Sequence, residues 1–241
     1  MKEKENEKKE KEPCCWIVGA GPCSGLTEEG FSPAQGDYII AADGGLRYLE
    51  TADVRPDMIV GDFDTLGFEP AHDNVVRLQV MKDWTDTFVA MEKGAALGYR
   101  NFVFHGCLGG KLEHTIANLQ HLVWLAGRGM TGWMTDGRVW VTAICGDVDE
   151  DGGAGCINDC ANDGAKSGRL ALSARDRGMI SVFCMGDKAQ GVTLKGLKYT
   201  LDDAGLTGSF PLGVSNEFIG DPASIEVKKG CLLVVISRHA D

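Results

Sequence analysis

The sequence predicts an α/β N-terminal domain with a mostly parallel sheet, followed by an all-β sandwich as the C-terminal domain. Apolar runs alternate with helical stripes over the first half of the chain, which is typical of a parallel sheet covered by helices. From about residue 130 the stripes stop, and short strand-like runs separated by Gly, Asp and Pro follow, as in a sandwich or barrel. The 241 residues, of which 44% are hydrophobic, suffice for two modest domains.

The composition divides the chain into segments. Residues 1–13 begin with a run of Lys and Glu, which indicates a disordered charged tail. Residues 14–129 are expected to form the α/β domain and residues 130–241 the β-sandwich. An acidic segment at about 146–177 is rich in Gly, Asp and Asn in its first part and indicates a flexible insertion between two strands.

Charge and hydropathy argue against several partners and locations. The net charge of −11 is opposite to that of a nucleic-acid-binding protein. No apolar run approaches the length of a membrane span, and the start lacks the apolar region of a secretion signal, so we expect a cytoplasmic protein. The nine scattered cysteines are then expected to be free thiols in a reducing environment.

Strand-like and helix-like segments alternate in the first domain. The helical stripe over 112–126 is the clearest, and glycines follow both expected helices. Thr85 or Asp83 is expected to cap the first of them. The expected strands are 38–42, 58–60, 75–80 and 102–104, and the expected helices are 86–97 and 112–126.

Two carboxylates, Asp62 and Asp64, follow the apolar run that ends at Val60. In an extended segment, side chains two residues apart point to the same side. Two carboxylates about 4 Å apart repel by roughly 4 kcal/mol at an effective dielectric of about 20, and a cation removes that cost. The pair therefore indicates a candidate Mg²⁺ site beside substrate phosphates. The alternative is that both residues are turn formers at a strand end.

Polar clusters follow three further apolar runs. Asp43 and two glycines follow the run at 38–42, residues 82–86 follow the run at 75–80, and residues 105–114 follow the run at 102–104. Ligands of open α/β sheets bind beyond the C-terminal ends of parallel strands. The repetition therefore favours a site over turn chemistry alone.

Taken together, these residues resemble the thiamine pyrophosphokinase family, bacterial type. The resemblance runs from about residue 16 to residue 237, apart from the insertion, and its motifs occur in the family's order. They are ADGG at 42–45, GDFDT at 61–65, KDWTD at 82–86, GGKLEH at 109–114 and GVSNEF at 213–218.

The resemblance implies Mg²⁺-dependent transfer of the pyrophosphoryl group of ATP to the hydroxyl of thiamine, giving thiamine diphosphate and AMP. It implies a catalytic nucleotide- and metal-binding first domain, a thiamine-binding second domain, and a homodimer with thiamine at its interface. The implied metal ligands are Asp62, Asp64 and Asp86, with Asp43 at the edge of the site. The implied phosphate and ligand contacts are Lys82, Thr85, Lys111, Glu113, His114, Asn118, Ser215 and Asn216.

Two positions depart from the family pattern, because Lys111 and Glu113 stand where Arg and Asp are usual. Lysine keeps the charge but loses the bidentate fork of arginine. A metal-dependent phosphohydrolase also fits the carboxylate pair. A non-catalytic sensor of thiamine or nucleotide is the third alternative, and Glu113 is the feature that hints at it.

Other motifs indicate weaker alternatives. The glycines at 19–25 resemble a dinucleotide fingerprint but are better explained as a first strand and turn. Residues 147–152 match half of a calcium loop, and Cys156 and Cys160 have the closest spacing to a zinc pair. Without the resemblance, Ser215 and Asn216 indicate turn formers. The expected strands of the second domain are 139–144, 179–183, 191–194, 225–227 and 232–236.

Overall fold

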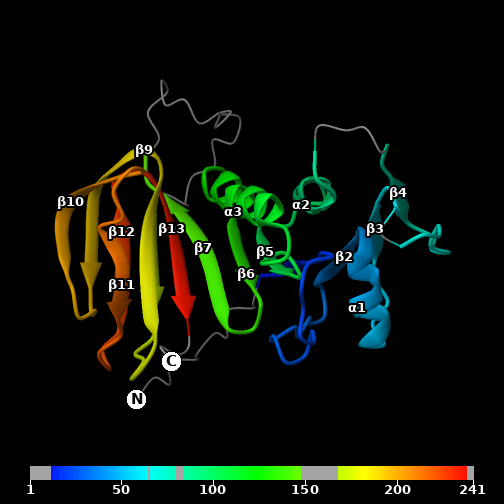
Figure 1. Cartoon of the computed structure of the whole chain (residues 1–241), viewed down its shortest axis with the longest axis horizontal. Helices are drawn as coiled ribbons and strands as arrows, with labels where there is room; N and C mark the ends of the chain where they lie inside the picture. The colour runs from blue at the N-terminus through cyan, green and yellow to red at the C-terminus, as the bar shows by residue number, and fades with distance from the viewer. Residues whose placement is uncertain (1–11, 65, 80–83, 148–167, 238–241) are drawn as a thin grey trace, which may run out of the picture.

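Six neighbouring strands form a parallel sheet in the N-terminal half of the protein, as the alternating pattern predicts (Figure 1). The computed structural model describes residues 12–64, 66–79, 84–147 and 168–237. The strand order is β4–β3–β2–β1–β5–β6. The strands are β1 (Cys14–Val18), β2 (Tyr38–Ala42), β3 (Met58–Gly61), β4 (Val75–Arg77), β5 (Asn101–His105) and β6 (Thr131–Thr135).

Helices cover both faces of this sheet. A 3-10 turn (Asp43–Gly45) leads into α1 (Leu46–Thr51), and α2 (Asp86–Ala96) and α3 (Leu112–Ala126) lie on the other face (Figure 1). Alternate residues of β1 serve the two faces: Ile17 packs in the cluster with the residues of α2 and α3, whereas Trp16 packs in the cluster with those of α1. The sequence predicts the bounds of α3 correctly and places the end of α2 one residue too late.

The strand order reverses between β1 and β5. Going out from β1, the chain adds β2, β3 and β4 on one side, then returns to add β5 and β6 on the other. In such sheets, a crevice opens beyond the C-terminal ends of the strands on either side of the reversal. The loops after β1 and β5 therefore face one another above this edge.

The C-terminal half is antiparallel and continues the same sheet. It is joined through β6, which pairs in parallel with β5 and antiparallel with β7, so the sheet runs across the expected boundary at residue 130. Its strands are β7 (Val139–Cys145), β8 (Gly168–Leu172), β9 (Met179–Lys195), β10 (Leu201–Thr207), β11 (Gly213–Glu217), β12 (Ala223–Val227) and β13 (Lys229–Ser237).

The longest strand, β9, corrects one prediction from the sequence. The runs at 179–183 and 191–194 are the two ends of this single strand, which pairs with β13 along its first part and with β12 and β10 along its last. Gly191, with φ of 67°, lies inside the strand instead of ending it. A glycine in a strand often marks a bulge or bend, and here the pairing partners change on either side of it.

The expected insertion at 146–177 is corrected in its last part. Residues 168–172 form β8, which pairs antiparallel with β12. Leu170 packs against the buried cluster of this half, which explains why a strand forms there. Residues 148–167 lie outside the described residues, and with them lie most of the calcium-like segment and both Cys156 and Cys160.

The expectation that all cysteines are free thiols is wrong for one pair. Cys145 and Cys231 form a disulfide between β7 and β13, where the two residues are direct cross-strand partners with Cα atoms 4.1 Å apart. The two are 86 positions apart in the chain, so the sequence alone does not show that they meet. Among the described residues, five other cysteines form no disulfide: Cys14, Cys15, Cys23, Cys107 and Cys184. Within the described ranges, no helix is long and apolar enough to cross a membrane.

Candidate active site

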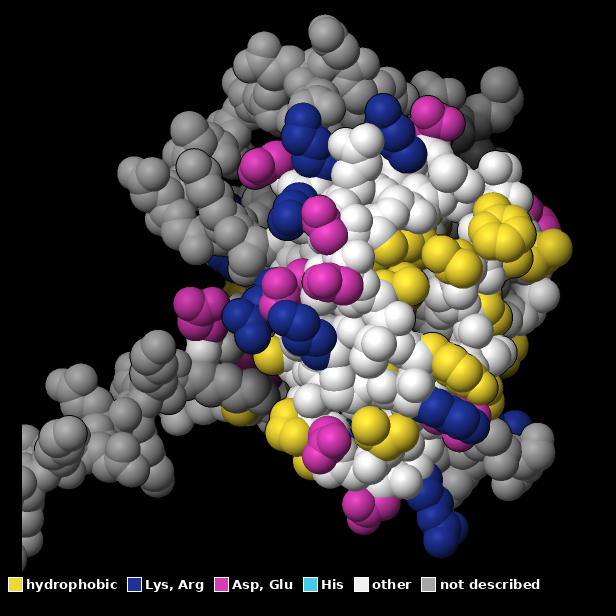
Figure 2. Space-filling view, turned by 90° about the vertical axis from the view of Figure 1, so that its left-hand side faces the viewer, with side chains coloured by type: hydrophobic (Ala, Val, Ile, Leu, Met, Phe, Trp, Pro, Cys, Tyr) yellow, Lys and Arg dark blue, Asp and Glu magenta, His cyan; other side chains and the backbone are white. Residues whose placement is uncertain are grey.

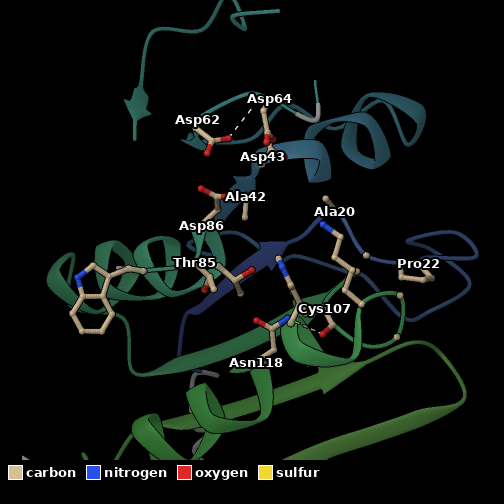
Figure 3. Close-up of a pocket in the computed structure, with 18 residues that line it drawn as sticks. Ala20, Pro22, Ala42, Asp43, Asp62, Asp64, Thr85, Asp86, Cys107 and Asn118 are labelled. Atoms are coloured by element: carbon tan, nitrogen blue, oxygen red, sulfur yellow. Dashed lines mark hydrogen bonds between the residues drawn. The ribbon is translucent and has the colours of Figure 1, made fainter. Parts of the chain in front are cut away.

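A cavity of about 540 Å³ opens at the C-terminal edge of the parallel sheet (Figure 3). The loops after β1, β2, β3 and β5 and the first turns of α2 and α3 surround it. All of these except the loop after β1 belong to the polar clusters that the sequence predicts. The lining residues are Ala20, Gly21, Pro22, Ala42, Asp43, Asp62, Asp64, Trp84, Thr85, Asp86, Thr87, Gly106, Cys107, Gly109, Gly110, Lys111, His114 and Asn118.

Three carboxylates meet on one side of this cavity. One oxygen each of Asp43, Asp62 and Asp64 lies within 4.8 Å of the others, and Figure 3 shows the three side chains converging. Asp43 directly follows β2 and is only 5% exposed. The sequence places Asp43 at the edge of the site, but the structure makes it the most deeply buried member of the group.

The backbone that brings Asp62 and Asp64 together is not the extended strand that the sequence argument assumes. Strand β3 ends at Gly61, and Phe63 adopts a left-handed conformation with φ of 66°. The Phe63 side chain is buried in the cluster beneath α1, which holds this turn in place. The amide of Asp64 donates a hydrogen bond of 3.3 Å to Oδ1 of Asp62. A tight turn therefore produces the pairing.

The three carboxylates fit a hard divalent cation. Carboxylate oxygens are the ligands that Mg²⁺ prefers. Oδ1 of Asp43 is buried and has no hydrogen-bond partner among the described residues, although a buried polar atom without a partner normally costs stability. A cation bound between the three side chains would satisfy this oxygen and offset their mutual repulsion.

Asp86 lines the same cavity but lies outside the group of three. It is the first residue of α2, and Thr85 caps this helix by accepting a hydrogen bond of 3.2 Å from the amide of Phe88. Figure 3 shows the Asp86 carboxylate on the same side of the cavity as the three acids. A carboxylate in a first helical turn is also stabilised by the helix dipole, so Asp86 has a structural role besides its expected one.

The opposite side of the cavity offers groups suited to phosphate. Gly109 and Gly110 have positive φ, and Lys111 follows them at the N-terminus of the 15-residue helix α3. The loop after β1 is tied to this side by a hydrogen bond of 2.7 Å from the Gly21 amide to the carbonyl of Gly106. A helix N-terminus preceded by a glycine-rich turn favours bound anions. Lys82, the other expected cation, lies outside the described residues.

Helix α3 contributes two more of the expected residues. Asn118 is buried, and its Nδ2 donates a hydrogen bond of 2.8 Å to the carbonyl of Cys107, which fixes the amide against the cavity wall. His114 also lines the cavity. Glu113 is exposed, and the described lining does not include it.

Ser215 and Asn216 are not brought to this cavity. They lie in β11, in the antiparallel half. The Asn216 amide exchanges two hydrogen bonds with the backbone of Tyr199, at 2.6 and 2.9 Å, and its oxygen also accepts from the amide of Glu217. The Ser215 amide donates to Oγ of Ser181. The contact expected between these two residues and a ligand stays a prediction.

Sequence reasoning assigns no role to several of the lining residues. Ala20, Gly21 and Pro22 belong to the glycine-rich turn after the first strand, Trp84 lies inside the KDWTD motif, and Thr87 directly follows that motif. Cys107 also lines the cavity, but burial raises the pKa of its thiol to about 12. The thiol therefore stays protonated at neutral pH and is a poor nucleophile.

Comparisons with known proteins agree with this geometry. Two family models match the chain, thiamin pyrophosphokinase catalytic domain over residues 33–134 and thiamin pyrophosphokinase vitamin B1 binding domain over residues 170–232. Together they span more than half of the chain. The chain has no match among curated protein sequences.

Solved structures confirm the fold. Thiamine pyrophosphokinase from Bacillus subtilis superposes with a TM-score of 0.76 at 21% identity, covering 94% of this chain and all of that one. The protein from Geobacillus thermodenitrificans gives 0.74 at 21% identity, covering 95% of this chain and 99% of that one. The yeast enzyme gives 0.68 at 12% identity, covering 96% and 88%.

Proposed function

Because this chain belongs to the thiamine pyrophosphokinase family and has that family's activity, we propose that it uses Mg²⁺ to transfer the pyrophosphoryl group of ATP to thiamine. The metal assignment rests on the group formed by Asp43, Asp62 and Asp64, in which the buried Oδ1 of Asp43 has no hydrogen-bond partner among the described residues. This group and a glycine-rich turn at a helix N-terminus line one cavity. Cation and phosphate sites thus share one space.

The proposed reaction forms one bond and breaks one. The hydroxyl oxygen of thiamine attacks the β-phosphorus of ATP, and the bond from that phosphorus to the oxygen bridging to the α-phosphorus breaks. AMP leaves with the bridging oxygen, and the β- and γ-phosphates end on thiamine. The hydroxyl proton passes to a base, for which an aspartate of the acidic group is the candidate. Transfer of this kind depends mainly on positioning and on stabilising charge on the phosphates.

Each residue has a proposed part in that positioning. Asp43, Asp62 and Asp64 would hold Mg²⁺, which supplies charge stabilisation at the transferred phosphates, and Asp86 would complete the ligand set or orient it. Lys111 and the turn before it would bind phosphate oxygens. Thr85 accepts its capping bond through oxygen, so its hydroxyl hydrogen remains to donate. The expected roles of Lys82, His114 and Asn118 stay part of the proposal.

The family match favours the transferase over the two alternatives from the sequence. A phosphohydrolase could use a water activated at the acidic group, but it could not use the cavity thiol at Cys107 as nucleophile, because this thiol is kept protonated. A sensor was suggested by Glu113, but this side chain is exposed and lies outside the described lining of the cavity. The presence of Glu113 in place of the family's usual aspartate therefore does not alter the acidic group.

We also propose that the antiparallel half is a β-sandwich thiamine-binding domain and that thiamine lies between two copies of the chain. Strands β7, β9, β10, β12 and β13 contribute to one buried cluster, which supports two packed layers. The end of the molecule that carries β10 shows hydrophobic side chains gathered on its surface (Figure 2). Exposed large hydrophobic residues in this part of the chain are Tyr199, Phe210, Leu212, Val214 and Ile219.

A cytoplasmic location is part of the same proposal because ATP, the proposed donor, is made and kept in the cell. The five described cysteines that form no disulfide support it. The Cys145–Cys231 disulfide is the observation that speaks against it.

Removal of the metal tests the proposal. Chelation should abolish formation of thiamine diphosphate, and added Mg²⁺ should restore it. Asp62→Asn should lower the rate on the order of 10²-fold, as loss of one preorganised charged group does, and should weaken Mg²⁺ binding measured by calorimetry. The matched control is Asp73→Asn, an exposed aspartate paired with Arg55, which should change neither. Normal turnover without divalent cation, or in Asp62→Asn, would refute the metal assignment.

A further inference from the structure

Trp84 combines high exposure with a place in the active-site cavity. Its side chain is 59% exposed, and among the exposed large hydrophobic residues of the described ranges it alone lines this cavity. It directly precedes Thr85 and Asp86, which line the same space. An exposed indole gains little from burial in the free protein, so its position beside the charged groups calls for a ligand to explain it.

A series of packed aromatic rings supports one face of the Trp84 indole. It lies on Phe88 with ring centroids 4.8 Å apart and an interplanar angle of 20°. Phe88 is buried and in turn contacts His121 and Trp124, at 5.2 and 5.7 Å. The guanidinium of Arg128 lies 3.8 Å from the Trp124 ring and covers it. One face of the indole is therefore occupied by packing against Phe88. Phe88 in turn is held in place by packing between α2 and α3.

We propose that the exposed side of Trp84 stacks on the base of the bound nucleotide, an inference that rests on the proposed use of ATP. The acidic group and the turn before α3 account for the metal and the phosphates, so the planar end of the nucleotide still needs an apolar partner. A cavity of about 540 Å³ is of the size that encloses one small ligand. An indole is the flat apolar surface that such a base requires.

This role gives affinity with little base selectivity. Every base has a π-face, so stacking on an aromatic side chain tolerates different bases. We expect the chain to accept both purine triphosphates with similar affinity and to bind pyrimidine triphosphates more weakly, because their rings cover less of the indole.

The test distinguishes the affinity that comes from the base from the affinity that comes from the phosphates. Calorimetry in the presence of Mg²⁺ and without thiamine would compare a non-hydrolysable ATP analogue with inorganic tripolyphosphate, which has no base. Trp84→Ala should lower the affinity for the analogue roughly tenfold, which is the size of one base–aromatic stacking contact. It should leave the affinity for tripolyphosphate unchanged. Trp84→Phe should keep most of the affinity. Ile116→Ala, an exposed apolar residue of α3 outside the cavity lining, should bind like the parent chain.

Several outcomes would overturn the inference. If Trp84→Ala weakened the binding of both ligands equally, Trp84 would only support the start of α2. If the affinity for both ligands stayed unchanged, Trp84 would make no contact with the bound nucleotide. Fluorescence gives an independent readout, because the analogue should quench a signal that Trp84→Phe lacks. Quenching by thiamine in place of the nucleotide would assign Trp84 to the other substrate. A base-dependent effect in a protein that makes no thiamine diphosphate would uphold Trp84 and refute the proposed function.

Discussion

Asp43 is the residue whose conformation fits the proposed cation site most clearly. Its backbone has φ of 47°, a left-handed conformation that aspartate adopts at some cost, and its buried Oδ1 has no partner among the described residues. Strain and an unpaired buried oxygen in one residue are features that persist at functional sites. Sequence reasoning found this aspartate by its place after a strand, but its burial follows from the packing around it.

We expect Asp43→Asn to lower the rate on the order of 10²-fold, because the amide removes one charge from the acidic group. The free energy of unfolding should stay the same or rise, since an unpaired buried carboxylate is costly. Steady-state kinetics and thermal melts measure the two effects. Asp53→Asn is the matched control, because Asp53 also has positive φ but is exposed. A variant with normal rate, or one that fails to fold, would contradict this reading of Asp43.

Glu113 departs from the family pattern at a position where the structure predicts little effect. It lies in the first turn of α3, where either acidic side chain interacts favourably with the helix N-terminus. We therefore expect Glu113→Asp to keep or raise the rate of thiamine diphosphate formation. A collapse of activity, with the melting temperature unchanged, would mean that the site has adapted to the longer side chain.

At the residue scale, spacing in the sequence indicates which side chains have suitable chemistry but not the backbone geometry that brings them together. Asp62 and Asp64 were found from their spacing, but the turn at Phe63 that joins them is fixed by burial of its ring, which no local pattern shows. The contact expected between Asn216 and a ligand stays a prediction, and within this chain its amide is hydrogen-bonded to the backbone of Tyr199. Contacts between distant segments decide such cases.

At the scale of elements, helix α3 links the site to the pH dependence of stability. His121 is buried on this helix against Phe88, and burial lowers the pKa of its imidazole to about 4. An unfolded histidine has a pKa of about 6.5. The unfolded state therefore binds more protons between these values, so stability is fully present above about pH 6.5 and falls as the pH drops toward 4.

We expect the free energy of unfolding to fall by about 2 kcal/mol more in the parent chain than in His121→Leu between pH 7.5 and pH 5. Denaturant titrations at the two pH values measure this difference. The control is an exposed residue of the same helix that carries no titratable group, through Gln120→Leu, which should leave the slope with pH unchanged. Parallel pH profiles for the parent chain and His121→Leu would show that this imidazole does not titrate as proposed.

The sequence predicts the bounds of elements with a strong apolar periodicity, but not those of strands that depend on pairing with distant strands. The apolar stripe of α3 sets both of its ends, and β2 matches its apolar run. The sequence predicts two strands where β9 is one, and it predicts a flexible acidic insertion over the segment in which β8 forms. Both strands are stabilised by neighbours that lie far away in the sequence.

At the scale of the whole molecule, the strand order creates the site. Only the placing of β1 beside β5 brings the loop at 19–22 against the turn before α3, and only the placing of β3 beside β2 joins Asp43 to the acid pair. The sequence predicts the parallel sheet and the edge at which ligands bind. It does not reveal the single sheet that runs through β6 into the antiparallel half, nor the disulfide across β7 and β13.

The ratio of products tests the central claim most directly. The purified chain would be given ATP, Mg²⁺ and thiamine, and both the nucleotide and the thiamine products would be separated and counted over time. The account predicts that AMP and thiamine diphosphate form in equal amounts and that neither forms without thiamine. ADP with thiamine monophosphate, or phosphate released in the absence of thiamine, would contradict transfer of an intact pyrophosphoryl group.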